Sequence, residues 1–260
     1  MAIIHWQIAN QSHCGNVRKV NEDALLVQPG YPLFTIADGM GGHAAGDIAS
    51  QMLIDELTAL QLKPTLPGAT EQVNDALLTC NNKILDYSAS TLDGKTAGST
   101  VVAMLSRLNQ ATCLWAGDSR LYRHRDAQLE QLTEDHSYVA ELVKSGQLAP
   151  EDAINHPNAN IITRTVGAEP DLQLDKIHFE VKPGDTYLLC SDGLYNEIDA
   201  ADLQQALAAE DIFRSADSLL NLCLRGKARD NVSFIIARAL EQGEGEESTE
   251  PLDATIALFP

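Results

Sequence analysis

The stretch "LFTIADGMGGHAAGDIAS", residues 33–50, joins an apolar run to a helical pattern through a turn rich in glycine. The run ends in a carboxylate, Asp38, and Gly39, Gly41 and Gly42 follow it directly in the turn. Glycines at such a turn usually permit a positive φ angle or a close approach of the backbone to another group. A carboxylate at the edge of this turn suggests that the other group is a cation.

The composition is that of a soluble globular protein, with 260 residues, 44% hydrophobic and 21% charged. A net charge of −19 repels nucleic acid and anionic membranes, so we expect neither as a partner. No apolar run approaches the length of a membrane span and the N-terminal residues do not resemble a signal peptide, so we expect a cytoplasmic protein. Five scattered cysteines without a CxxC pair argue against a disulfide framework or a zinc finger.

The pattern of apolar residues predicts an α+β protein with a β-sandwich. Nine short apolar runs are typical of strands, and brief turn signals separate several of them, as in antiparallel meanders. The runs lie at residues 5–10, 24–28, 32–37, 99–106, 111–117, 120–125, 177–181, 186–191 and 232–240. Helical periodicity appears in four segments, residues 47–60, 70–87, 137–146 and 215–226. This order of elements favours a sandwich over strict alternation of strands and helices.

Two segments depart from the pattern of a packed domain at residues 1–240. Residues 147–170 are polar and contain three prolines, which predicts a surface excursion or flap. Residues 241–260 contain six acidic residues and no basic residue, so we expect a disordered tail.

Four aspartates share one local context, an apolar run next to the carboxylate and a small or polar residue on its other side. They are Asp38, Asp118, Asp192 and Asp230. One such aspartate would be a turn residue. In a sandwich, however, strand ends gather at one rim, and carboxylates that converge there raise one another's pKa unless a cation compensates them. Hard divalent ions with oxygen ligands, Mg²⁺ or Mn²⁺, are the natural compensation.

A fifth segment, "NVRKVNEDALLV" at residues 16–27, places Arg18, Glu22 and Asp23 before a strand. Phosphate binding would account for an arginine beside an acidic metal site, because the guanidinium fork binds phosphate oxygens in bidentate fashion. The alternative, an exposed arginine near two acids, stays open from this segment alone.

Together these segments resemble the metal-dependent protein phosphatases of the 2C type, in their bacterial form. Eight motifs occur in the family order over about residues 8–238. They are Arg18-x-x-Asn21-Glu22-Asp23, Asp38-Gly39-Met40-Gly41-Gly42-His43, Gly98-Ser99-Thr100, Gly117-Asp118-Ser119-Arg120, Thr133-x-Asp135-His136-Ser137, Thr163-Arg164-x-x-Gly167, Ser191-Asp192-Gly193 and Asp230-Asn231.

The resemblance implies a central antiparallel β-sandwich flanked by helices in α-β-β-α layers, with a flap subdomain and a binuclear Mn²⁺/Mg²⁺ centre at one end. It implies a hydrolase that removes phosphate from phosphoserine and phosphothreonine in proteins through a metal-activated water. Phosphorylated proteins are then the substrates, a bacterial Ser/Thr kinase is the opposing enzyme in signal transduction, and a monomer is expected.

The resemblance also assigns the metal ligands. Asp38 bridges the two ions, the Gly39 carbonyl binds one of them, and Asp192 and Asp230 complete the ligands of the other. Asp118, together with Asp192, resembles a looser third site.

The remaining assignments concern the substrate and the outer ligands. Arg18 holds the phosphoryl oxygens, while Glu22 and Asp23 act largely through metal-bound waters. Eukaryotic relatives have a histidine acid where this chain has Met40. His43 and His136 are candidate positions for the acid, and a metal-bound water is an alternative to both. A loop or cap role for His136 is the simpler interpretation.

One position leaves the number of ions open. Asn196 stands where many relatives have aspartate, so the sequence allows two ions or three.

The sequence leaves two other function classes as alternatives. A nucleotide-binding module would use Gly39-x-Gly41-x-x-Ala44, but Asp38 would then face a pyrophosphate and no acid closes a second strand about 20 residues later. A catalytically inactive, phosphopeptide-binding relative is the second alternative. Retention of Arg18 and of the ligand aspartates argues against it.

Overall fold

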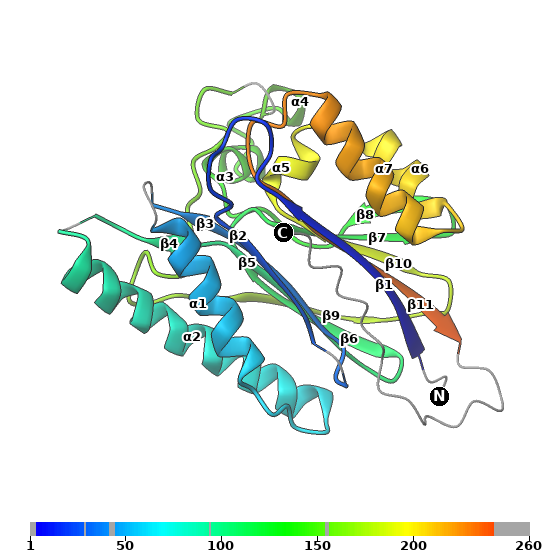
Figure 1. Cartoon of the computed structure of the whole chain (residues 1–260), viewed down its shortest axis with the longest axis horizontal. Helices are drawn as coiled ribbons and strands as arrows, with labels where there is room; N and C mark the ends of the chain where they lie inside the picture. Colours follow the sequence, from blue (N-terminus) through cyan, green and yellow to red (C-terminus); the bar gives the residue numbers. More distant parts are fainter. Residues whose placement is uncertain (1–3, 29, 42–44, 94, 154–155, 242–260) are drawn as a thin grey trace.

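Two β-sheets pack face to face, and helices cover both outer faces (Figure 1). The computed structural model describes residues 4–28, 30–41, 45–93, 95–153 and 156–241. The α-β-β-α layers confirm the predicted fold class. Within these ranges, none of the helices combines the length and the apolar character needed to span a bilayer.

The first sheet has five strands in the spatial order β1-β11-β10-β7-β8, and each neighbouring pair is antiparallel. Its strands are β1 (Ile4–His13), β7 (Arg120–Arg125), β8 (Gln128–Gln131), β10 (Thr186–Cys190) and β11 (Val232–Glu241). Strand β11 therefore includes Glu241, the first residue of the predicted tail. The rest of that tail lies outside the described residues.

The second sheet runs in the order β2-β3-β5-β6-β9, again antiparallel, and β4 pairs with β3. Its strands are β2 (Asp23–Gln28), β3 (Leu33–Met40), β4 (Gly98–Ser99), β5 (Val101–Arg107), β6 (Gln110–Ala116) and β9 (Asp175–Glu180). All nine predicted strands are present. The pattern missed β4, which has two residues, and β8, whose sequence "QLEQ" is almost entirely polar.

Three apolar layers hold the sandwich together. Between the sheets, Trp6 meets the rings of Phe34 and Tyr187 edge-on, with centroids 5.5 and 5.8 Å apart. Helices α1 (Gly46–Thr58) and α2 (Leu66–Thr91) cover the second sheet, while α5 (Asp192–Tyr195), α6 (Ala200–Ala208) and α7 (Ile212–Arg225) cover the first. Each long helix thus buries one apolar face against a sheet.

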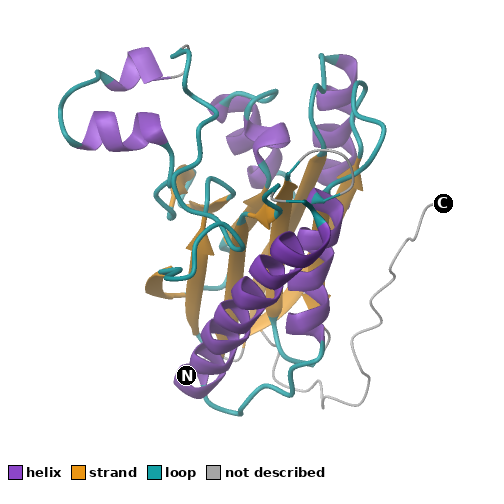
Figure 2. Ribbon diagram, turned by 90° about the vertical axis from the view of Figure 1, so that its left-hand side faces the viewer, coloured by secondary structure: helices purple, strands orange, loops and turns teal. Residues whose placement is uncertain are grey.

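Two short helices stand away from the sandwich (Figure 2). Helix α3 (Tyr138–Lys144) begins at the cap residue Ser137, and α4 (Pro150–Ala153) follows it. Ser137 forms an isolated antiparallel bridge with Ile162, where the excursion returns to the body. The excursion therefore starts about ten residues before the predicted flap at 147–170. The amphipathic pattern of α3 is typical of a helix packed on the core, so nothing in the sequence indicates that α3 belongs to the excursion.

Candidate metal centre

The strand-end aspartates lie on one rim of the sandwich. Asp38 is near the end of β3 and Asp118 follows β6, and these two strands run in the same direction because both are antiparallel to β5. In the other sheet, Asp192 follows β10 and Asp230 precedes its antiparallel neighbour β11. Ser191, next to Asp192, donates a hydrogen bond to the carboxylate of Asp23, which lies opposite Asp38 in the second sheet, so the ends of the two sheets face a common space.

Asp23 joins this group from the start of β2, directly opposite Asp38 in the antiparallel register. The hydroxyl of Ser191 donates to its Oδ2 at 2.8 Å, whereas its buried Oδ1 has no hydrogen-bond partner among the described residues. Burial raises the pKa of Asp23 to about 6, although the hydrogen bond from Ser191 opposes the rise. An unpartnered buried carboxylate oxygen is costly, so this position favours a cation or a donor from outside the chain.

The other rim carboxyls show the same electrostatic conflict. Burial, followed by the charge of Asp23, raises the pKa of Asp38 well above its ordinary value. Burial and the charge of Asp135 raise the pKa of Asp118 to about 6, and burial with the charge of Asp118 raises that of Asp192 to about 7.

This donor set fits divalent cations, because added positive charge would remove the mutual repulsion and the ligands are all oxygens. Within the described ranges, no three His, Cys, Asp or Glu side chains lie close enough together to hold a metal ion as they stand. The carboxylates thus share a space without forming a finished ligand cage.

The glycine turn after Asp38 is explained by close packing. The Gly39 N–H donates to the Glu22 carbonyl at 3.0 Å, and a Cβ on Gly39 would lie 2.1 Å from the Gly46 carbonyl oxygen. Glycine therefore lets the start of α1 lie against the end of β3. Gly41 has a φ of +144°, an angle that residues with a Cβ rarely adopt. The binding of an ion by the Gly39 carbonyl stays a prediction, and His43 lies outside the described residues.

Arg18 lies at the same rim, paired with a predicted metal ligand. Its Nη2 donates to Asp230 Oδ2 at 2.7 Å, and the two side chains are 48% and 39% exposed. Such an exposed ion pair contributes little to stability, typically about 0–1 kcal/mol. Arg18 is therefore within reach of the site and can exchange partners at low cost.

Asn231 is a site residue that the sequence analysis did not assign a role. Its Oδ1 accepts from the Glu22 N–H at 2.8 Å, and its Nδ2 donates to the carbonyls of Val20 and Cys14 at 3.0 and 3.1 Å. The side chain thereby ties the loop that carries Arg18 to the start of β11. The adjacent Asp230-Asn231 motif marked the position, but partners more than 200 residues away are invisible in one sequence.

His136 supports the turn before Asp118. Its ring stacks on Trp115, with centroids 6.1 Å apart and planes 9° apart, and its Nδ1 accepts from the Gly117 N–H at 3.1 Å. Its Nε2 lies 3.3 Å from Asp175 Oδ2. Burial is the main cause of its lowered pKa. These contacts favour the structural interpretation of His136 over that of a proton donor.

Comparisons with known proteins point to one family. The model of the family described as protein phosphatase 2C matches residues 11–224. Over 247 residues the chain is 36% identical to the serine/threonine protein phosphatase PstP of Mycobacterium tuberculosis, covering 94% of this chain but only 46% of PstP. The chain thus spans about half the length of that relative. It is also 34% identical to the serine/threonine phosphatase Stp of Listeria monocytogenes, over 85% of this chain and 91% of that one.

Solved structures agree with the sequence relatives. PppA, described as a key regulatory component of T6SS in Pseudomonas aeruginosa, superposes with a TM-score of 0.85 at 41% identity. The superposition covers 92% of this chain and 100% of PppA. The catalytic domain of PstP in complex with two manganese ions gives a TM-score of 0.81 at 33% identity, covering 92% of this chain and 99% of that domain.

Proposed function

This chain belongs to the protein phosphatase 2C family, and we propose on that basis that it hydrolyses phosphoserine and phosphothreonine esters in proteins with the help of Mn²⁺. The observation that carries the proposal is the convergence of Asp23, Asp38, Asp118, Asp192 and Asp230 from both sheets on one rim. The raised pKa values of Asp23, Asp38, Asp118 and Asp192 indicate a site that is electrostatically unfavourable without cations. The manganese ions of the PstP catalytic domain support the same metal here.

Asp38, the Gly39 carbonyl, Asp192 and Asp230 are the proposed ligands of two ions. When bound, the ions supply the charge that offsets the carboxylates and the Lewis acidity that makes water a nucleophile near neutral pH. The Oδ1 of Asp23, which lacks a partner in the described chain, is free to orient a water molecule from the opposite strand. Glu22 lies next to it and is proposed to do the same.

Arg18 is the proposed phosphate-binding group. In the free protein its guanidinium neutralises part of the charge of Asp230. An ion bound by Asp230 would compete for that carboxylate, and the exposed guanidinium would then be available for a phosphoryl group. The same side chain can therefore serve as a temporary counterion and as a substrate-binding residue.

A third ion and the use of Mg²⁺ are further proposals. Asp118 and Asp192 are close enough for the charge of Asp118 to raise the pKa of Asp192, so the two carboxyls can share an ion. Asn196 donates to Asp192 Oδ2 at 3.1 Å and supplies a neutral amide at this place. Oxygen ligands of this kind suit Mg²⁺ as well as Mn²⁺.

We propose a role in signal transduction opposite a Ser/Thr kinase, in the cytoplasm and as a monomer. The names of the relatives support protein substrates, and the similarity to PppA supports a regulatory role. An inactive binding module is the less favoured alternative, since Arg18 and all predicted ligand aspartates are present at the rim.

The test is hydrolysis of an aryl phosphate and of a phosphothreonine peptide with Mn²⁺, with Mg²⁺ and with EDTA. We expect turnover only with a divalent ion, and a loss of at least about a hundredfold in Asp192→Asn. Asp171→Asn, which removes the same charge from an exposed position, is the control. Phosphopeptide binding without turnover by the folded, metal-loaded protein would contradict the proposal and favour the binding module.

A further inference from the structure

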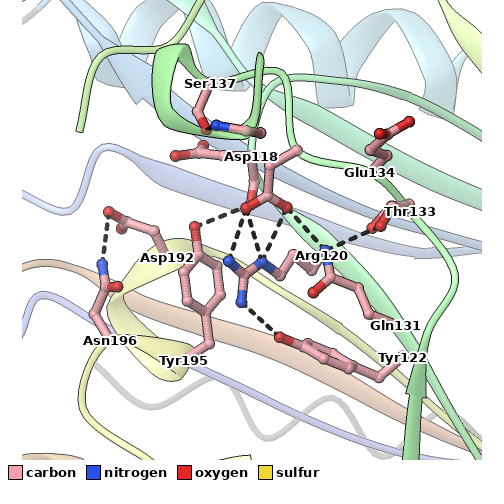
Figure 3. Close-up of polar contacts among 12 residues, drawn as sticks. Asp118, Arg120, Tyr122, Gln131, Thr133, Glu134, Ser137, Asp192, Tyr195 and Asn196 are labelled. Atoms are coloured by element: carbon pink, nitrogen blue, oxygen red, sulfur yellow. Dashed lines mark hydrogen bonds and ion pairs between the residues drawn. The ribbon is translucent and has the colours of Figure 1, made fainter. Parts of the chain in front are cut away.

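Tyr195 links two of the rim aspartates (Figure 3). It is the last residue of α5, the one-turn helix that begins with Asp192. Its hydroxyl donates to the backbone carbonyl of Asp118 at 3.1 Å. In Figure 3 the Tyr195 ring lies between Asp192 and Arg120. The helical turn that carries Asp192 is thus tied to the backbone that carries Asp118.

Arg120 gives the Tyr195 ring a fixed platform. Its guanidinium carbon lies 3.6 Å from the centre of the ring. All three guanidinium nitrogens are bonded, Nε and Nη2 to Asp135 at 3.0 and 2.7 Å and Nη1 to the Tyr122 hydroxyl at 2.8 Å. A guanidinium bonded in bidentate fashion to a carboxylate, and only 23% exposed, has little freedom to turn. The ring stacked on it is therefore held in place as well.

The turn that carries Asp118 is also anchored on its other side. The Gly117 carbonyl accepts from the His136 N–H at 2.9 Å, and the hydroxyls of Ser119 and Thr100 are 2.7 Å apart. Because this turn is anchored, the hydrogen bond from Tyr195 to the Asp118 carbonyl fixes the position of α5 relative to the turn. Two carboxylates that repel each other are thereby kept at a set spacing.

We propose that Tyr195, held by Arg120, is a positioning residue that sets the spacing of Asp118 and Asp192 and thereby the affinity for a divalent ion bound by both. The inference rests on the proposed function, in which these carboxylates share an ion. Small divalent ions such as Mg²⁺ demand near-ideal ligand geometry, so a small displacement of one ligand weakens binding. Tyr195 does not touch the ion in this account and acts through the backbone of Asp118.

The test compares Tyr195→Phe with Tyr122→Phe. Both variants remove one hydroxyl from the surroundings of Arg120, but only Tyr195 contacts Asp118. Mn²⁺ binding to the folded protein is followed by calorimetry, and the Mn²⁺ dependence of peptide hydrolysis is measured in parallel. We expect Tyr195→Phe to raise the dissociation constant of the weakest Mn²⁺-binding step about five- to tenfold, which corresponds to the loss of one hydrogen bond. The tighter Mn²⁺-binding steps and the KM for the peptide should not change. Arg120 keeps its bidentate pair with Asp135 when the Tyr122 hydroxyl is removed, so Tyr122→Phe should leave every step within about twofold of the wild type.

A second variant guards against a folding defect in the first. Arg120→Lys keeps the charge near Asp135 but loses the flat fork beneath Tyr195, so the same weak step should be affected. Equal titrations of wild type and Tyr195→Phe, or equal losses in Tyr195→Phe and Tyr122→Phe, would overturn the positioning role while the proposed function stands. A wild-type protein that binds no Mn²⁺ would overturn both.

Discussion

Arg18 and Asp230 illustrate how a single contact can serve two states of the site. The pair is exposed and 2.7 Å long, so it is too weak to be kept for stability. In the proposed function, the ion pair keeps a guanidinium beside the rim carboxylates until an ion and a phosphate bind. Arg18 is therefore expected to affect catalysis but not the stability of the fold.

Arg18→Ala tests this expectation. We expect kcat/KM for the phosphothreonine peptide to fall about 10- to 100-fold, because a charged hydrogen-bond donor to the phosphoryl group is lost. The free energy of unfolding should change by less than about 0.5 kcal/mol, as is usual for an exposed side chain. The control is Arg214→Ala, since the Arg214 side chain on α7 is 88% exposed. Unchanged kcat/KM in Arg18→Ala would exclude a role in phosphate binding.

At the level of individual residues, the sequence identified the acids but not their supports. Asp38 and Asp192 stand out because each follows an apolar run, and their type alone restricts the chemistry to oxygen ligation. Ser191, Asn231 and Tyr195 could not be found this way. Each acts through a hydrogen bond to a residue at least 77 positions away, which a single sequence does not record.

At the level of elements, helix α2 anchors the segment that returns from the excursion. Asn81 is 1% exposed; its Oδ1 accepts from the Gly167 N–H at 2.7 Å and its Nδ2 donates to the Glu169 carbonyl at 2.9 Å. The predicted helix over residues 70–87 was right, yet its pattern gave Asn81 no special place. A polar residue on the buried face of a helix is the signal that could have indicated such an anchor.

Asn81→Ala should lower the free energy of unfolding by about 2–4 kcal/mol. The substitution leaves the buried Gly167 N–H without its partner, removes the hydrogen bond to the Glu169 carbonyl and opens a small cavity. Urea unfolding of the metal-loaded protein measures the change. Asn74→Ala on the same helix, which removes an exposed hydrogen bond from the amide to the neighbouring Asp75, should cost less than about 0.5 kcal/mol. Equal losses in the two variants would show that α2 does not anchor this segment.

Two strands, β4 and β8, and three helices, α4, α5 and α6, were not predicted from the sequence. Strand β8 is polar because it lies at the edge of its sheet, and β4 is too short to show alternation. Helix α5 has only four residues, too few to repeat a helical period, although its Leu194 is fully buried against the first sheet. Periodicity predicts an element when it is long enough to repeat a buried face, and the nine-residue α6 has only two buried residues, Leu203 and Leu207.

At the level of the whole molecule, the sandwich concentrates negative charge at one end. Asp23 and Asp118 have pKa values of about 6 and Asp192 of about 7, all raised above the ordinary range, first of all by burial. A carboxyl with a raised pKa binds its proton more tightly in the folded state. The stability that it contributes is therefore present at low pH and is lost as the pH rises from about 4 to 7.

This linkage predicts opposite effects of Asp192→Asn with and without metal. At pH 7.5 in EDTA the variant should melt about 2–4 °C or more above the wild type, because an uncharged amide replaces a repelled carboxylate. Near pH 4, where the wild-type carboxyl is protonated, the difference should vanish. Mn²⁺ at pH 7.5 should raise the melting temperature of the wild type more than that of the variant.

Asp171→Asn is the control for net charge and should melt like the wild type under all three conditions. A metal-free Asp192→Asn that melts below the wild type at pH 7.5 would contradict the electrostatic account of the rim.

The most direct measurement is a crystal structure of the protein with Mn²⁺, with the ions located by anomalous scattering. The account predicts anomalous peaks at the rim, contacted by Asp38 together with Asp192 and Asp230, and an Arg18 guanidinium that no longer bonds to Asp230. Ions bound elsewhere, or a rim without ions in crystals of a protein that hydrolyses phosphopeptide, would contradict it.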